Sequence, residues 1–201
     1  MVDILEMPFG NVFAVQCAFA RLGVMTRVVR SPDDVASSSA LVVPGVGAFG
    51  ATLAALRDRG VADLLAGRVA ARRPTLGICL GMQIFFAGSE ESPGVAGLGV
   101  LSGQLARVTT AEVPHFGWAE VGWSNQSSSQ WAFFSHSFAA EDVSPGFDDF
   151  ELAMCRSGGS GGFVAALRSG AVSLCQFHPE LSGRSGSEFL KNWIDVVRGE
   201  S

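Results

Sequence analysis

The sequence predicts an α/β fold: a mixed, largely parallel central sheet flanked by helices, with a smaller antiparallel β region. Up to Phe86, short apolar runs alternate with stretches of helical periodicity, which is typical of parallel strands connected by helices. From Val100 to Phe138 the segments are short and rich in Val, Trp and Phe, separated by Gly, Ser and Asn, which favours extended strands. The chain closes on an amphipathic helix.

The strands expected in the first half are short apolar runs at residues 2–5, 26–29, 40–43 and 75–79. The helices expected between them have apolar residues three or four apart: residues 12–22, capped by Asn11 and stopped by Gly23; a stretch containing Leu53, Leu56, Val61, Leu64 and Leu65; and one starting at 82–86. Strands with helices between them at these lengths predict a parallel sheet covered on both faces.

In the second half, residues 163–167 and 171–177 are expected to form a hairpin, and 124–130 and 157–162 to be turns or loops. The last helix has one apolar face, and Ser185 with Glu188 predicts a capping box at its start. That apolar face comprises Phe189, Leu190, Trp193, Ile194 and Val197.

Composition bounds the function. The 201 residues, 48% hydrophobic and 16% charged, predict a single domain over 1–201. A net charge of −5 with scattered Lys and Arg argues against nucleic acid. No apolar run reaches the ~20 residues that span a bilayer. Four distant cysteines without a CxxC pair indicate neither a disulfide framework nor a metal site, so we expect a cytoplasmic protein without metal or cofactor.

Cys79 stands between Gly77 and Gly81, where a buried strand is expected to turn into a helix. A nucleophile elbow needs small residues on both sides, because its strained backbone brings neighbouring chain close. The helix behind it favours a thiolate. Cys79 is therefore a candidate nucleophile, with a tight structural turn as the alternative. Packing is the interpretation for Cys17, Cys155 and Cys175.

A histidine base is available at the end of another predicted strand. His178 follows residues 172–177 and precedes Glu180. The carboxyl ends of parallel strands gather along one edge of a sheet, so His178 can meet Cys79 there, and Glu180 can fix the tautomer of the imidazole. These three residues predict a Cys-His-Glu triad.

A loop at the end of a third strand could complete an acyl-transfer site. Pro44-Gly45-Val46-Gly47 is either an ordinary turn or a source of backbone N–H groups for an oxyanion, acting with the N–H of Leu80.

Five motifs occur in order: P-G-V-G-A-F at 44–49, G-I-C-L-G-M-Q at 77–83, P-H-F-G-W at 114–118, F-S-H-S-F at 134–138 and Q-F-H-P-E at 176–180. With them the chain resembles the class I (triad) glutamine amidotransferases, most closely the glutaminase subunits of imidazole glycerol phosphate synthases in histidine biosynthesis. The resemblance covers nearly the whole chain, from the Gly10-Asn11 turn to the last helix.

The resemblance implies roles for these residues. Cys79 would attack the amide of L-glutamine and form a thioester, His178 would shuttle the proton, and Glu180 would orient His178. Val46 and Leu80 would supply oxyanion N–H groups. Substrate contacts are implied for Gly47, Gln83, Glu91 and Ser137, and structural or substrate-loop roles for His115 and His136. A (β/α)8-barrel cyclase subunit, making imidazole glycerol phosphate and AICAR, would form a heterodimer with the chain and receive the ammonia.

The chain also departs from the family pattern. Residues 6–9, Glu-Met-Pro-Phe, replace the usual start of the N-terminal turn. Phenylalanines, Phe133 and Phe138, stand where tyrosines are usual, Ala119 replaces an asparagine, and Leu181 replaces a lysine. We expect these changes to gather on the partner face, together with Asn11 and Trp118. Three alternatives stay open: a glutaminase serving another amidating partner, as in sugar modification; a non-catalytic regulatory subunit; and a cysteine hydrolase for peptides or γ-glutamyl compounds.

Overall fold

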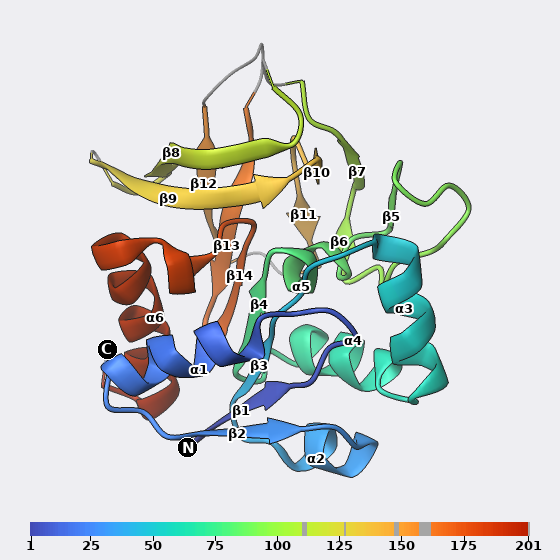
Figure 1. Ribbon diagram of the computed structural model, residues 1–201, viewed down its shortest axis with the longest axis vertical. Coiled ribbons are helices and arrows are strands. Elements are labelled where there is room, and N and C mark those ends of the chain that lie inside the picture. The colour runs from blue at the N-terminus through green and yellow to red at the C-terminus, as the bar shows by residue number, and fades with distance from the viewer. Residues whose placement is uncertain (110–111, 127, 147–148, 157–161, 201) are drawn as a thin grey trace.

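The computed structural model describes residues 1–109, 112–126, 128–146, 149–156 and 162–200 (Figure 1). Its main sheet is built from β1 (Val2–Leu5), β2 (Thr26–Val29), β3 (Leu41–Val43), β4 (Thr75–Ile78), β8 (His115–Trp123), β9 (Ser129–His136), β12 (Glu151–Cys155), β13 (Phe163–Ser169) and β14 (Val172–Cys175). Two small sheets contain β5 (Gly88–Ser89), β7 (Gln104–Arg107) and β10 (Phe138–Ala139), and β6 (Leu101–Ser102) and β11 (Ser144–Pro145).

Strand order divides the main sheet into a parallel and an antiparallel part. Among the described residues the order is β2-β1-β3-β4-β14-β13-β12-β8-β9. Neighbours are parallel from β2 to β14 and antiparallel from β14 to β9. The predicted mixed α/β fold is confirmed. The strand-rich middle of the chain extends this sheet through β8, β9 and β12, and also supplies the two small sheets.

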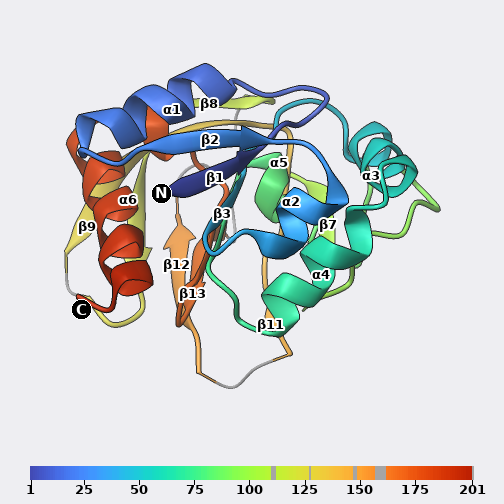
Figure 2. The same ribbon diagram turned by 90° about the horizontal axis from the view of Figure 1, so that it is seen from below.

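The helices cover both faces of the parallel strands. They are α1 (Val12–Arg21), α2 (Pro32–Ser37), α3 (Phe49–Asp58), α4 (Ala62–Ala70), α5 (Leu80–Gln83) and α6 (Gly183–Arg198), with a 3-10 turn at Pro179–Leu181. Helices α1 and α6 lie on one side of the sheet and α2, α3 and α4 on the other (Figure 2). Each side has its own hydrophobic core. Phe19 of α1 and Trp193 of α6 meet edge to face in one core, and Leu56 of α3 and Leu65 of α4 lie in the other. No helix in the described ranges is both long and apolar enough to cross a membrane.

Two predicted helices need correction, and a third helix is missing from the prediction. The helical stretch around Leu53 and Leu65 is two helices, α3 and α4, because the chain turns at Gly60 with φ of +68°. The helix expected at 82–86 is only the single turn α5. Helix α2 was not predicted, although Ser31 and Asp34 form a capping box there. Of the two expected loops, residues 157–161 and 127 lie outside the described residues, and Ser129 already belongs to β9.

The expected capping box of the last helix is also wrong. Helix α6 begins at Gly183, two residues before Ser185, so Ser185 and Glu188 lie inside it. The hydroxyl of Ser185 donates to the carbonyl of Trp131, and Glu188 accepts from Arg184 four residues earlier. The apolar face is as predicted, with Phe189, Leu190, Trp193 and Ile194 buried and Val197 packed against the core.

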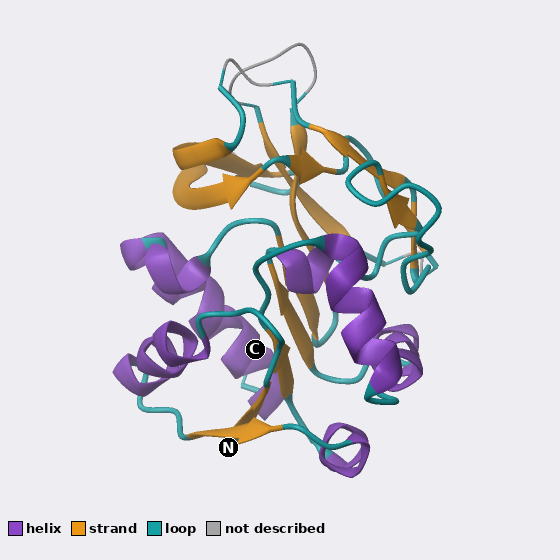
Figure 3. Cartoon of the chain, turned by 45° about the vertical axis from the view of Figure 1, so that its right-hand side comes forward, coloured by secondary structure: helices purple, strands orange, loops and turns teal. Residues whose placement is uncertain are grey.

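The sheet places three candidate segments side by side. Strands β3, β4 and β14 are neighbours and run parallel, so residues 44–47, Cys79 and His178 all leave the same edge of the sheet. The β8–β9 hairpin lies above this edge, with the helical layers below it (Figure 3). Its residue Phe133 accepts the backbone N–H of His178, which ties the hairpin to the site.

Candidate active site

Cys79 occupies a backbone turn that close packing enforces. It has a φ of +53°, a strained value for a residue with a side chain, between β4 and α5. A Cβ on Gly81 would lie 1.8 Å from the carbonyl oxygen of Val43, and one on Gly77 would lie 2.6 Å from that of Gly81. Both glycines are therefore required by the close approach of neighbouring backbone, as an elbow demands.

Cys79, His178 and Glu180 are brought together in one buried cluster. His178 Nδ1 lies 2.8 Å from Glu180 Oε1, and both side chains are nearly inaccessible. Burial lowers the pKa of His178, but hydrogen bonds to Cys79 and Glu180 outweigh it and raise the pKa to about 10. The imidazolium form is thus favoured beside the sulfur, which is the arrangement that stabilises a thiolate nucleophile.

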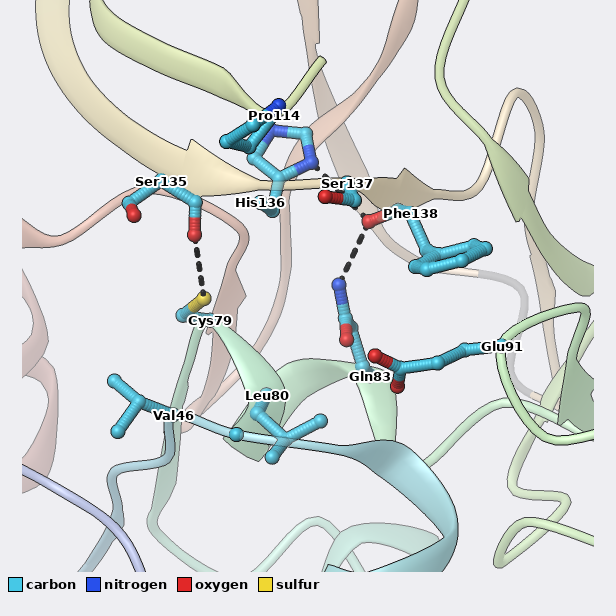
Figure 4. A pocket seen from close by; sticks show the side chains of 11 residues that line it. Val46, Cys79, Leu80, Gln83, Glu91, Pro114, Ser135, His136, Ser137 and Phe138 are labelled. Carbon is cyan, nitrogen blue, oxygen red and sulfur yellow. Dashed lines mark hydrogen bonds between the residues drawn. The ribbon is translucent and has the colours of Figure 1, made fainter.

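The predicted substrate residues line one pocket of about 250 Å³, together with Cys79 (Figure 4). Gly47 belongs to this lining with a φ of +105°, and Gln83, Glu91 and Ser137 complete the predicted set. Sulfur lies at one end of the pocket, and the Glu91 carboxylate lies beside the Gln83 amide away from it (Figure 4). A small polar molecule bound here would reach the sulfur while its far end met a carboxylate.

Glu91 has a second contact outside the pocket. Its Oε2 accepts the backbone N–H of Phe49 at 2.7 Å, and the hydroxyl of Ser92 accepts that of Gly50 at 3.1 Å. These residues cap the start of α3, whose own N-cap residue, Ala48, has no side chain that can do so. Because α3 follows residues 44–47 directly, this remote cap anchors the downstream end of the candidate oxyanion loop.

The two expected oxyanion donors do not face the pocket as a pair. The backbone N–H of Leu80 donates to the carbonyl of Gly45, and that of Val46 donates to the carbonyl of Phe9, each at 3.3 Å. Both bonds involve the single peptide unit between Gly45 and Val46: its oxygen accepts one and its N–H makes the other. Val46 and Leu80 both line the pocket, but their backbone N–H groups donate to backbone carbonyls.

The three residues expected on a partner face all lie near the aromatic side chains of Phe116 and Phe133: Asn11 and Leu181 line one hollow with both, and Trp118 packs against Phe133. Trp118 is 52% exposed and Leu181 is 47% exposed. Asn11 is exposed, and its side chain accepts the backbone N–H of Ala14 as the cap of α1. Phe133 packs edge to face against both Trp118 and Phe116.

The expectation for two of the substituted positions is wrong. Ala119 is only 2% exposed and belongs to the core, since side chains alternate along β8 and Trp118 takes the outward position. Phe138 is half-buried and lines the pocket around Cys79. Neither side chain belongs to the aromatic cluster of Phe116, Trp118 and Phe133. Leu181, in contrast, lines one hollow with Phe116 and Phe133.

The remaining histidines and cysteines lie in packed surroundings, with one exception. Burial lowers the pKa of His136 to about 3, and His115 packs against it with ring centroids 5.4 Å apart. Cys155 and Cys175 are buried, as the packing interpretation requires, but Cys17 is only half-buried. His136 also lines the pocket, so it forms part of the wall.

Sequence reasoning assigned no role to three groups that lie at the site. Gln176 donates its amide N–H to Cys79 Sγ at 3.5 Å, and the carbonyl oxygen of Ser135 lies 3.9 Å from the same sulfur. The hydroxyl of Ser182 donates to the His178 carbonyl and accepts the N–H of Phe133. The available signal was the place of Gln176 at the start of the Q-F-H-P-E motif, two residues before His178.

The fold and the grouping of Cys79, His178 and Glu180 suit an enzyme that transfers acyl groups. The family model for Glutamine amidotransferase class-I matches residues 9–196, and the chain belongs to that family. Solved structures agree in fold. A crystal structure of glutamine amidotransferase has a TM-score of 0.71 at 19% identity, covering 98% of this chain and 100% of the other. PurLQS from Thermotoga maritima has 0.69 at 17%, covering 98% and 97%.

Within the family, the chain is similar to subunits of imidazole glycerol phosphate synthases. The chain is 39% identical to the imidazole glycerol phosphate synthase subunit HisH of Mycolicibacterium paratuberculosis, over 96% of this chain and 97% of the relative. It is 34% identical to the subunit of the same name from Methanothermobacter thermautotrophicus, over 98% and 100%.

Proposed function

We propose that this chain is the glutaminase subunit of an imidazole glycerol phosphate synthase and hydrolyses L-glutamine to glutamate and ammonia. The observation that carries the proposal is the buried Cys79–His178–Glu180 cluster, whose Cys79 lines a pocket that has the Glu91 carboxylate on the side away from the sulfur. The similarity to HisH subunits over nearly full length supports the same assignment. All of residues 1–201 are proposed to serve as one glutaminase domain.

The chemistry follows from the geometry. The thiol proton of Cys79 passes to His178, so that an S–H bond breaks and an N–H bond forms. The thiolate then attacks the side-chain amide carbon of glutamine, and His178 returns the proton to the leaving nitrogen, which departs as ammonia. Water, deprotonated by His178, attacks the thioester and releases glutamate and the thiol. Glu180 accepts from Nδ1 and keeps Nε2 directed at the sulfur.

Substrate binding is proposed to use complementary charges and backbone groups. The Glu91 carboxylate would accept from the α-ammonium group of glutamine, since its Oε1 is not used by the bond to Phe49. Gly47 and Ser137 would contact the α-carboxylate of the same amino acid, which their backbone and hydroxyl donors suit.

A peptide rotation is proposed to activate the enzyme. If the unit between Gly45 and Val46 turned over, its oxygen would release the N–H of Leu80 and its own N–H would leave Phe9. One rotation would thus free both oxyanion donors. Because one such donor is worth roughly 10²–10³ in kcat, the isolated chain should be slow and a partner that turns the peptide should accelerate it.

The proposed partner is a (β/α)8-barrel cyclase that receives ammonia, forms a heterodimer with this chain and makes imidazole glycerol phosphate and AICAR. A hollow of about 320 Å³ opens behind His178 and Glu180 and is lined by Phe116, Phe133 and Leu181. Val46 and Ser135 line both this hollow and the substrate pocket. Ammonia leaving Cys79 would pass between them, and an apolar exit disfavours its protonation to ammonium.

A different amidating partner is the second candidate, because Leu181 presents an exposed apolar side chain where the resemblance implies a lysine. The test mixes the purified chain with the cyclase subunit of its own organism and that subunit's ribonucleotide substrate. Glutamate release, lost in Cys79→Ser, supports the glutaminase, and formation of imidazole glycerol phosphate supports the partner. Glutamate without that product favours another acceptor. No Cys79-dependent glutamate under any of these conditions overturns the proposal.

A further inference from the structure

Gln176 is a buried amide placed between the nucleophile and the pocket wall. It follows β14, is 1% exposed, and is fixed by its backbone N–H, which donates to the carbonyl of Ala165 at 2.8 Å. Its side-chain Nε2 lies 3.5 Å from Cys79 Sγ, and its Oε1 accepts from Gln83 Nε2 at 2.9 Å. A buried amide facing a sulfur atom is a polar contact that packing alone does not require.

The direction of this chain of hydrogen bonds is fixed at its far end. Gln83 Nε2 also lies 2.8 Å from the carbonyl oxygen of Phe138, and a carbonyl can only accept. Gln83 must therefore point its NH2 group at both acceptors, which holds Gln176 with its oxygen toward Gln83 and its NH2 toward Cys79. The reversed amide of Gln176 would set two NH2 groups against each other and an oxygen against the sulfur.

We propose that Gln176 is a positioning residue that, oriented by Gln83, donates a hydrogen bond to the Cys79 thiolate and stabilises it over the thiol. The inference rests on the proposed role of Cys79 as nucleophile. A donor binds an anion more strongly than a neutral sulfur, so the bond favours transfer of the thiol proton to His178. It acts again when the C–S bond of the thioester breaks and its electron pair returns to sulfur.

The same geometry restricts what Gln83 can do for the substrate. Both hydrogens of its amide nitrogen are committed, one to Phe138 and one to Gln176. Only its oxygen remains, so Gln83 can accept from the substrate but cannot donate to it. Of the two charged groups on the α-carbon of glutamine, Gln83 therefore suits the ammonium group, on the side of the pocket where Glu91 lies (Figure 4).

The test measures the thiolate without using glutamine. In a Cys17→Ser background, the rate at which iodoacetamide alkylates Cys79 is followed by mass spectrometry across pH. Gln176→Met removes the donor at similar volume, and we expect the acid limb of the profile to move up by about one pH unit, which slows alkylation about five-fold at the original midpoint and about ten-fold well below it. Gln176→Glu places an ionisable carboxyl toward the sulfur and should move it further.

Ser173→Ala is the matched control, since Ser173 is a buried polar residue of β14 outside the site. It should leave the profile in place. An unmoved profile in folded Gln176→Met overturns the proposal, and if that variant does not fold, an unmoved profile in Gln176→Glu does. Failure of the glutaminase is separate: it appears as absence of glutamate from the unmutated chain even with the partner and the partner's substrate present, whatever the alkylation profile.

Discussion

The two halves of the proposed acyl-transfer site differ in how firmly folding sets them. Residues 77–81 hold Cys79 in a strained turn wedged between backbone atoms. Residues 44–47 carry one proposed oxyanion donor, Val46, in a loop where that residue is 40% exposed, and the N–H groups of Val46 and of Leu80 in the elbow both bind other carbonyls. The fold assembles the proposed nucleophile, whereas the proposed oxyanion donors would need the rearrangement of the Gly45–Val46 peptide. Such a division would let glutamine bind without being hydrolysed until the acceptor site is ready.

Energetics support the division. The two bonds that hold the Gly45–Val46 peptide are 3.3 Å long, at the weak end of the range for N–H···O bonds. Each contributes about 1 kcal/mol, so breaking both lies within what binding of a partner can supply. Moving residues 77–81 would instead require the buried ends of β3, β4 and β14 to separate.

Gly81→Ala tests the rigid half and has the largest expected effect. The new Cβ would lie 1.8 Å from the Val43 carbonyl oxygen, so β3 or the elbow must shift, and we expect a loss of about 4 kcal/mol or more in the free energy of unfolding. Urea unfolding measures it. Gly67→Ala is the control: a Cβ there meets nothing within 4 Å inside α4, and should stabilise by ~0.5–1 kcal/mol. Equal effects at the two glycines would contradict the close packing.

Val46→Pro tests the mobile half. Proline has no backbone N–H, so one oxyanion donor is lost, and kcat in the presence of the activating partner should fall by roughly 10²–10³, while alkylation of Cys79 stays unchanged. Val46→Ala keeps the N–H and should stay within a few-fold of the unmutated chain. If the proline variant turned over glutamine normally, Val46 could not be a donor.

His136 extends the comparison to the pocket wall. Burial lowers its pKa to about 3, below the value of about 6.5 expected in the unfolded chain. The unfolded state therefore binds the extra proton first, and stability is lost as pH falls from about 6.5 toward 3, by about 1.4 kcal/mol per pH unit. His136→Phe, among Phe134 and Phe163, should flatten that slope in urea unfolding measured at several pH values. An unchanged slope would mean that His136 is already charged in the folded protein.

Much of the rigid half could be predicted from sequence, because its signals are local. The two glycines that flank Cys79 indicate a close approach of neighbouring backbone. Cys79 and His178 each follow a predicted strand, which places both residues at the same edge of the sheet. The orientation of the Gly45–Val46 peptide could not be predicted, since glycine allows either orientation and the deciding partner, the Phe9 carbonyl, is remote in sequence.

Helix ends show the same limit. Asn11 was a correct cap because its partner, Ala14, is three residues away. Ser185 and Glu188 have the spacing of a capping box but lie within α6, where Ser185 instead binds Trp131 on β9. The break between α3 and α4 could not be predicted, because the helical spacing of apolar residues continues across Gly60.

Ser92→Ala tests the point where the mobile loop meets fixed structure, and its expected effect is the smallest. The Ser92 hydroxyl caps α3 from 42 residues away. Losing it should lower the free energy of unfolding by about 1 kcal/mol. The bond from Phe49 to Glu91 remains, so KM for glutamine should hardly change. A modest fall in kcat with partner, with Cys79 alkylation unaltered, would show that the start of α3 helps to set the oxyanion loop.

Ser187→Ala, at an exposed site in α6, is the control for loss of a serine hydroxyl. If Ser92→Ala slowed alkylation of Cys79 instead, the two halves would be mechanically joined and the contrast between them would fail.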